Sequence, residues 1–134
     1  MLILIVDDEP IMCRSIAAVL SATGQPYVVE QFSGKHCGAA ALKWLEIHKP
    51  DYCVLDVLLN GVSGLDVAKK VNEKYPETHV LLMTGCADDS EYYDKAIDYA
   101  AKNNNVTCLL KRESTTGKTF IGALLEDLNN ITQA

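Results

Sequence analysis

The chain has 134 residues, of which 49% are hydrophobic and 22% are charged. This length is typical of a single domain, and the balance of apolar and charged residues excludes an intrinsically disordered chain. Eighteen acidic residues against twelve basic ones give a net charge of −6, which argues against direct binding of nucleic acid. We therefore expect one acidic, globular domain over residues 1–134.

Cysteines, histidines and apolar segments all argue against a secreted, metal-cluster or membrane protein. The five cysteines are scattered without a C-x-x-C spacing, which indicates reduced thiols rather than disulfides or a zinc site. His36, His48 and His79 show no ligand spacing, so we expect surface or internally hydrogen-bonded histidines. The first apolar run, Leu2–Val6, is too short for a signal peptide and is followed by acidic residues. We expect a cytoplasmic protein.

Short apolar runs alternate with helical patterns along the chain. Leu2–Val6 has the unbroken apolar pattern of a strand buried on both faces, and Pro10 suits the first turn of the next helix. Four further strands and helices follow in alternation. The predicted strands are Leu2–Val6, Tyr27–Phe32, Tyr52–Leu55, Val80–Met83 and Val106–Leu110. The predicted helices are Pro10–Ala22, Ala39–Ile47, Leu65–Lys74, the segment from caps at Asp88–Ser90 to about Ala101, and Phe120–Ile131.

Five such units in series favour a doubly wound α/β fold, in which a parallel sheet carries helices on both faces. Ligands of such sheets bind at the carboxyl ends of the strands. The polar side chains that end or follow the strands are therefore the candidates for function. They are Asp7, Asp8, Asp56, Thr84 and Lys111.

Three of these five side chains are carboxylates, which repel one another and raise one another's pKa when they are close. A bound cation relieves this repulsion, and Mg²⁺ prefers carboxylate and carbonyl oxygens. Taken singly, each residue has a simpler explanation: acidic residues such as Asp7 and Asp8 suit a helix amino terminus, Asp56 suits a turn, Thr84 suits a cap, and Lys111 suits a solvated surface. Together at successive strand ends, they predict a magnesium site with a neighbouring ammonium and hydroxyl.

This set of strand-end residues resembles the receiver domain of two-component response regulators. The likeness runs from IVDDEP at Ile5–Pro10, through PDYCVLDVLLNGVSGLD at Pro50–Asp66 and HVLLMTG at His79–Gly85, to LLK at Leu109–Lys111. It implies a flavodoxin-like (βα)5 fold with a five-stranded parallel sheet in the order 2-1-3-4-5. It also implies that the chain is a single receiver domain.

The resemblance implies a phosphorylation-dependent signalling switch. Asp56 would accept a phosphoryl group from the phosphohistidine of a sensor histidine kinase or a phosphotransfer protein. Lys111 would pair with a phosphoryl oxygen, and Thr84 would donate a hydrogen bond to the group once it is attached. Such a domain is not an enzyme beyond its own phosphorylation and dephosphorylation.

The resemblance also implies a metal site and an output surface. Asp8, Asp56 and the backbone carbonyl of Leu58 would bind Mg²⁺, and Asp7 would hold a metal-bound water. The fourth helix, fifth strand and fifth helix would present the face that regulates an output domain or partner protein. Because the first predicted strand begins at residue 2, we expect a receiver at the amino end of its chain rather than one fused behind a kinase.

Three positions depart from the family pattern. Cys108 stands where the family usually has an aromatic residue, so the usual aromatic switch is in doubt. Arg112 and Asn60 each stand where a proline is usual. Because a cysteine buries too little surface to bias a switch, we expect the segment Gly85–Asn105 to respond to phosphorylation instead.

Two other functions stay open from the residues. One is a pseudo-receiver adaptor that acts without phosphorylation, although the complete acidic set counts against it. The other is a Mg²⁺-dependent phosphohydrolase with Asp56 as nucleophile. The haloacid-dehalogenase pattern places a further aspartate two residues beyond the nucleophile, and Leu58 stands there.

Overall fold

Five strands alternate with five helices in this computed structural model, which describes residues 1–59, 61–85, 91–111 and 119–132. The strands are β1 (Leu2–Val6), β2 (Val28–Phe32), β3 (Tyr52–Asp56), β4 (His79–Thr84) and β5 (Val106–Leu110). The helices are α1 (Pro10–Ala22), α2 (Cys37–Leu45), α3 (Gly64–Lys74), α4 (Glu91–Lys102) and α5 (Phe120–Thr132). None of the helices in this described part is long and apolar enough to cross a membrane.

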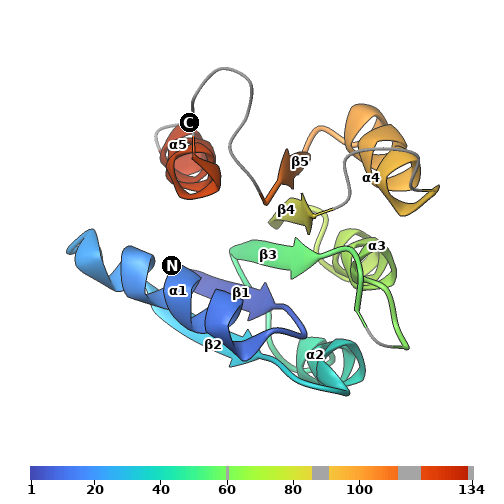
Figure 1. Cartoon of the computed structure of the whole chain (residues 1–134), viewed down its shortest axis with the longest axis horizontal. Coiled ribbons are helices and arrows are strands. Elements are labelled where there is room, and N and C mark those ends of the chain that lie inside the picture. The colour runs from blue at the N-terminus through green and yellow to red at the C-terminus, as the bar shows by residue number, and fades with distance from the viewer. Residues whose placement is uncertain (60, 86–90, 112–118, 133–134) are drawn as a thin grey trace.

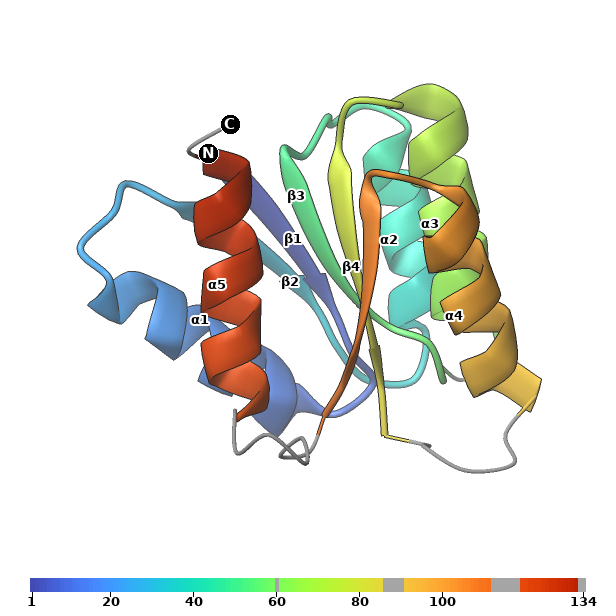
Figure 2. The same cartoon turned by 90° about the horizontal axis from the view of Figure 1, so that it is seen from above.

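The strands form one parallel sheet in the order β2-β1-β3-β4-β5. The sheet lies between two layers of helices, with α1 and α5 on one face and α2, α3 and α4 on the other (Figures 1 and 2). The order reverses between β1 and β3, so the carboxyl ends of these two strands flank the switch point at which such sheets bind ligands. The predicted flavodoxin-like fold and strand order are confirmed.

The core explains why the three central strands are almost wholly apolar. Residues of β1, β3 and β4 are buried on both faces, where helices cover them. One apolar cluster fills the α1/α5 face and another fills the α2/α3/α4 face. Cys53 of β3 is fully buried in this core. Cys108, on the edge strand β5, is half-buried against the second of these clusters.

The prediction for the second helix is wrong by two residues at each end. Ala40 donates its N–H to the carbonyl of His36 at 3.0 Å, so the helix begins before the predicted Ala39. It ends at Leu45 rather than at Ile47, which is 81% exposed. The remaining predicted bounds within the described residues differ by at most one residue. The predicted caps Asp88–Ser90 lie outside the described residues.

Candidate functional site

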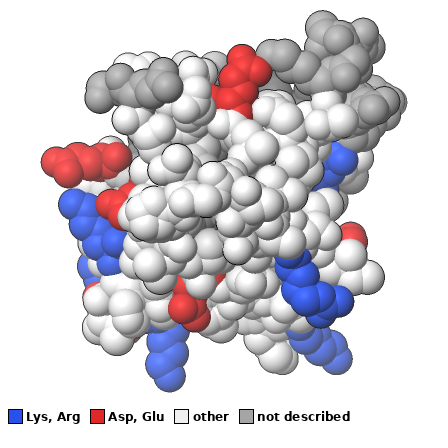
Figure 3. All heavy atoms as spheres, turned by 90° about the vertical axis from the view of Figure 1, so that its left-hand side faces the viewer, with Lys and Arg blue, Asp and Glu red and all other residues white. Residues whose placement is uncertain are grey.

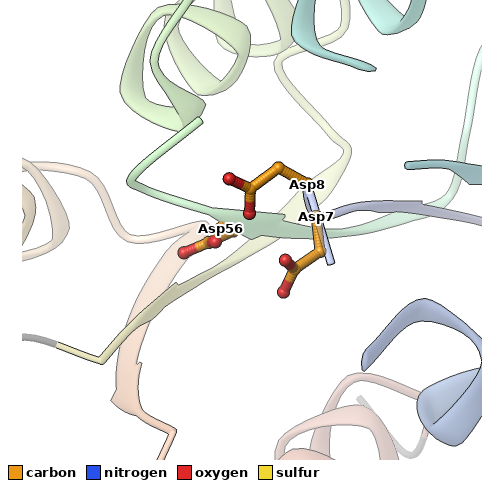
Figure 4. A group of neighbouring side chains, drawn as sticks. All are labelled: Asp7, Asp8 and Asp56. Carbon is orange, nitrogen blue, oxygen red and sulfur yellow. The ribbon is translucent and has the colours of Figure 1, made fainter. Parts of the chain in front are cut away.

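Three carboxylates meet at the switch point of the sheet. Asp56 is the last residue of β3, and Asp7 and Asp8 follow β1 directly. Because β1 and β3 are neighbours, one carboxylate oxygen from each of the three residues lies within 4.8 Å of the others (Figure 4). Asp7 and Asp56 are buried, at 0% and 4% exposure, and Asp8 is half-buried.

Lys111 brings a cation to these carboxylates from the end of β5. Its Nζ lies 2.8 Å from Asp7 Oδ2 and 3.0 Å from Asp56 Oδ2. The contact with Asp7 Oδ2 is an ion pair, and this buried oxygen makes no well-aligned hydrogen bond to a described residue. The backbone N–H of Lys111 donates to the carbonyl of Thr84 at 2.9 Å. Thr84 is the fully buried last residue of β4, so it also lies at this edge of the sheet.

The pKa values of the site reflect two opposing effects, burial of the charged groups and their pairing with opposite charges. Burial raises the pKa of Asp56 to about 6, and Asp7 and Asp8 add to the rise while Lys111 opposes it. Burial, with a hydrogen bond and repulsion from Asp7, also raises the pKa of Asp8. Burial alone would lower the pKa of Lys111, but its close pairing with Asp7 and its attraction to Asp56 outweigh that effect and raise the pKa. One ammonium therefore only partly compensates three carboxylates.

Backbone contacts fix where these side chains point. Asp7 Oδ1 accepts a hydrogen bond from the backbone N–H of Glu9 at 2.9 Å, which turns the chain into α1. The residue after Asp56 donates its backbone N–H to the carbonyl of Met83 at 2.9 Å, so β3 and β4 stay paired up to the site. The acidic group is therefore held by the sheet itself rather than by a loose loop.

Gly64 packs closely against the backbone of Asp56, a role that the sequence analysis missed. A Cβ atom at position 64 would lie 1.9 Å from the backbone carbonyl oxygen of Asp56, so only glycine fits there. Gly64 is the first residue of α3, and Ser63 caps this helix in a reciprocal pair of hydrogen bonds with Asp66. The sequence signal was the Ser63-Gly64 pair with Asp66 three residues after the serine, a capping-box pattern.

The donor atoms of the site suit a hard divalent cation. Three carboxylates within 4.8 Å of one another offer oxygen ligands, and the ion pair from Lys111 leaves their net charge negative. Leu58 lies in the segment between β3 and α3, two residues beyond Asp56, and is 37% exposed. Asn60 and Arg112, two of the departures noted above, lie outside the described residues.

Comparisons with known proteins agree on one family. The chain matches the response regulator receiver domain over residues 3–114. It is 32% identical over 109 residues to the probable transcriptional regulatory protein NarL of Mycobacterium tuberculosis, covering 81% of this chain and 46% of that protein. It is 33% identical over 103 residues to the oxygen regulatory protein NreC of Staphylococcus haemolyticus, covering 76% and 46%. The chain thus spans about half the length of these relatives.

Solved structures show the same fold. The receiver domain of the putative response regulator NarL from Mycobacterium tuberculosis is similar with a TM-score of 0.67 and 28% identity, over 96% of this chain and 95% of that one. The response regulator TrrA of Thermotoga maritima, solved in complex with Mg²⁺-BeF, has a TM-score of 0.69 and 24% identity, over 97% of both chains.

Proposed function

Because the chain belongs to the response regulator receiver domain family, we propose that it is a signalling switch in which Asp56 accepts a phosphoryl group. The observation that carries this proposal is the placement of Asp56. Its carboxylate is buried beside two other carboxylates and lies 3.0 Å from the Lys111 ammonium. A buried acidic cluster with a single cation is costly as a structural element, and it suits a site that binds a metal and a phosphoryl group.

The proposed reaction is an in-line displacement at phosphorus. A carboxylate oxygen of Asp56 forms a bond to phosphorus while the bond from phosphorus to the donor's imidazole nitrogen breaks. The pair of electrons leaves with the imidazole, and the product is an aspartyl phosphate. Lys111, already within 3.0 Å of Asp56, pairs with a phosphoryl oxygen, and the Thr84 hydroxyl donates a hydrogen bond to another.

The same cluster would hold Mg²⁺. Asp8, Asp56 and the backbone carbonyl of Leu58 would bind the ion, and Asp7 would hold one of its waters. When bound, Mg²⁺ supplies positive charge that offsets the negative charge of the carboxylates and of the transferring group. Support comes from the chemistry of the donor set and from the Mg²⁺-BeF complex of the related TrrA.

Two grooves suit the proposed partners. An apolar groove of about 360 Å³ beside Lys111 is lined by Ile11 of α1 and by Phe120 and Ile121 of α5, and a histidine kinase or phosphotransfer protein would dock there. Uncharged atoms fill the centre of the molecular face on which α1 and α5 lie (Figure 3). A second groove, of about 450 Å³, lies between α4 and α5 over β5 and includes Cys108, and an output domain or partner protein would bind there.

The test uses acetyl phosphate, a small donor that needs no kinase. With Mg²⁺, the intact mass of the parent protein should gain one phosphoryl group, and the Asp56→Asn variant should gain none. Asp98→Asn is the matched control, because it removes an exposed carboxylate of α4 whose ion pair, within the described part of the chain, is with Lys102. A parent mass that stays unchanged, with or without Mg²⁺, would contradict the proposal and favour an adaptor that acts without phosphorylation.

A further inference from the structure

Asp127 of α5 is a second partly buried aspartate, and it lies at the amino edge of the sheet, opposite the acidic cluster. Each of the three nearest strands contributes a partner from its first or second residue. The Tyr52 hydroxyl of β3 donates to Asp127 Oδ2 at 2.6 Å, and the Thr107 hydroxyl of β5 donates to Oδ1 at 3.0 Å. His79 of β4 places Nε2 3.3 Å from Oδ2. The carboxylate thus joins α5 to three strands at once.

The partners of Asp127 also hold one another in place. The rings of Tyr52 and His79 stack with centroids 5.6 Å apart and planes 6° from parallel. His79 Nε2 lies 3.1 Å from the Thr107 hydroxyl oxygen. Burial would raise the pKa of Asp127, but hydrogen bonds from His79, Tyr52 and Thr107 outweigh it and lower the pKa. We call these four residues the α5 anchor.

The two halves of α5 therefore have different surroundings. Its first residue, Phe120, lines the groove beside Lys111, so the amino half lies near the proposed phosphorylation site. Asp127 lies in the second half, where the anchor holds it. Both Phe120 and Asp127 also line the groove between α4 and α5. The α5 wall of that groove thus extends from near the proposed phosphorylation site to Asp127, which contacts the sheet.

We propose that the α5 anchor fixes the carboxyl half of this helix, so that phosphorylation of Asp56 rearranges only the amino half. This inference rests on the proposed function. Lys111 contacts Asp56 now and must adjust when a phosphoryl group is attached, and Lys111 and Phe120 line the same groove. Because the carboxyl half stays in place, the change is concentrated in the groove between α4 and α5 instead of spreading into a shift of the whole helix.

Hydrogen exchange read by mass spectrometry tests the anchor. The variant Tyr52→Phe removes one hydroxyl from the anchor and keeps the ring. Tyr99→Phe is the matched control, because the Tyr99 hydroxyl accepts a hydrogen bond from Asn72 at 2.6 Å in a separate polar contact involving α3 and α4. Asp127→Asn is a second anchor variant. Peptides covering residues 120–124 and 125–132 are compared with and without Mg²⁺ and beryllofluoride, a phosphoryl mimic.

In the parent and in Tyr99→Phe, beryllofluoride should change exchange in 120–124 and leave 125–132 unchanged. In Tyr52→Phe and Asp127→Asn, the change should extend into 125–132, which should also exchange about fivefold faster before beryllofluoride is added. A response of 125–132 in the parent, or a response confined to 120–124 in both anchor variants, would overturn the proposal.

The proposed function fails separately, if acetyl phosphate adds no phosphoryl group and beryllofluoride changes no segment of the parent. The unmodified variants still test the anchor in that case. Equal exchange of 125–132 in Tyr52→Phe and Tyr99→Phe would then overturn it, whereas faster exchange in Tyr52→Phe alone would support it.

Discussion

Buried or partly buried aspartates lie at both edges of the same sheet, and their surroundings differ. At the carboxyl edge, Asp7, Asp8 and Asp56 share one ammonium, and the pKa of Asp56 is raised to about 6. At the amino edge, Asp127 accepts hydrogen bonds from two hydroxyls and pairs with His79, and its pKa is lowered. The three carboxylates at the carboxyl edge have too few partners to offset their negative charge. Asp127, in contrast, has several partners that favour its charged form.

This difference distinguishes a proposed reaction site from a residue that stabilises the fold. A carboxylate whose partners favour its charged form contributes to stability, as Asp127 does. Carboxylates crowded by like charges weaken the fold, and they are expected where binding of a cation and a phosphoryl group makes up the deficit. The first set is the proposed reaction centre, and Asp127 holds the helix beside it.

The largest effect is expected where the backbone of the reaction centre is disturbed. Gly64→Ala would bring a Cβ to 1.9 Å from the carbonyl oxygen of Asp56, so backbone must move. We expect a loss of about 3 kcal/mol in unfolding free energy, measured by urea denaturation. Gly85→Ala is the control, because a Cβ there meets no atom of the described residues within 4 Å, and it should cost far less. Equal losses in the two variants would show that the close approach is unimportant.

Asp127→Asn is expected to lower the unfolding free energy by about 2 kcal/mol, because an amide leaves hydroxyl and imidazole partners of the anchor poorly paired. The control Asp98→Asn removes an exposed ion pair with Lys102 and should cost at most about 0.5 kcal/mol. Urea denaturation of both variants at pH 7 gives the comparison. If both lose the same small amount, the amino edge does not stabilise the fold as described.

A smaller effect is expected from mildly acid pH, which should raise the unfolding free energy of the metal-free protein. The pKa of Asp56 is raised from 3.8 to about 6, so protonation favours the folded state and the metal-free protein should gain stability as pH falls from 7 to 5. The gain from this group is about 1 kcal/mol. Asp127 does not offset it, because its lowered pKa makes its contribution disappear only below about pH 4.

The measurement is denaturation in EDTA at pH 7, 6 and 5, for the parent and for Asp56→Asn. Subtracting the variant removes the contribution of the histidines. A difference between the two proteins that does not change with pH would show that Asp56 titrates normally.

Much of the fold and the membership of the site followed from local patterns in the sequence. Short buried strands alternate with helices, and parallel strands align their carboxyl ends, so the sequence alone predicts Asp7, Asp56 and Lys111 at one edge. The second helix was misplaced because its residues 37–41, CGAAA, offer no capping side chain to mark where it begins.

Contacts between residues that are far apart in the sequence could not be predicted from local patterns. Tyr52 and Asp127 are 75 positions apart, and neither has a neighbour that signals the other. His79 was expected to be a surface or internally satisfied histidine, and its place beside Asp127 appears only when β3, β4 and β5 are aligned under α5. The role of Gly64 likewise depends on how closely α3 approaches β3.

The most direct test of the contrast between the two edges is the unfolding free energy of the parent and of Asp56→Asn at pH 7.5, each measured in EDTA and in Mg²⁺. Without metal, the variant should be more stable, by at most about 3 kcal/mol, because it removes one of three crowded charges. With Mg²⁺, the parent should gain stability and the variant much less. A variant that is less stable than the parent in EDTA, and that gains as much from Mg²⁺, would contradict the account.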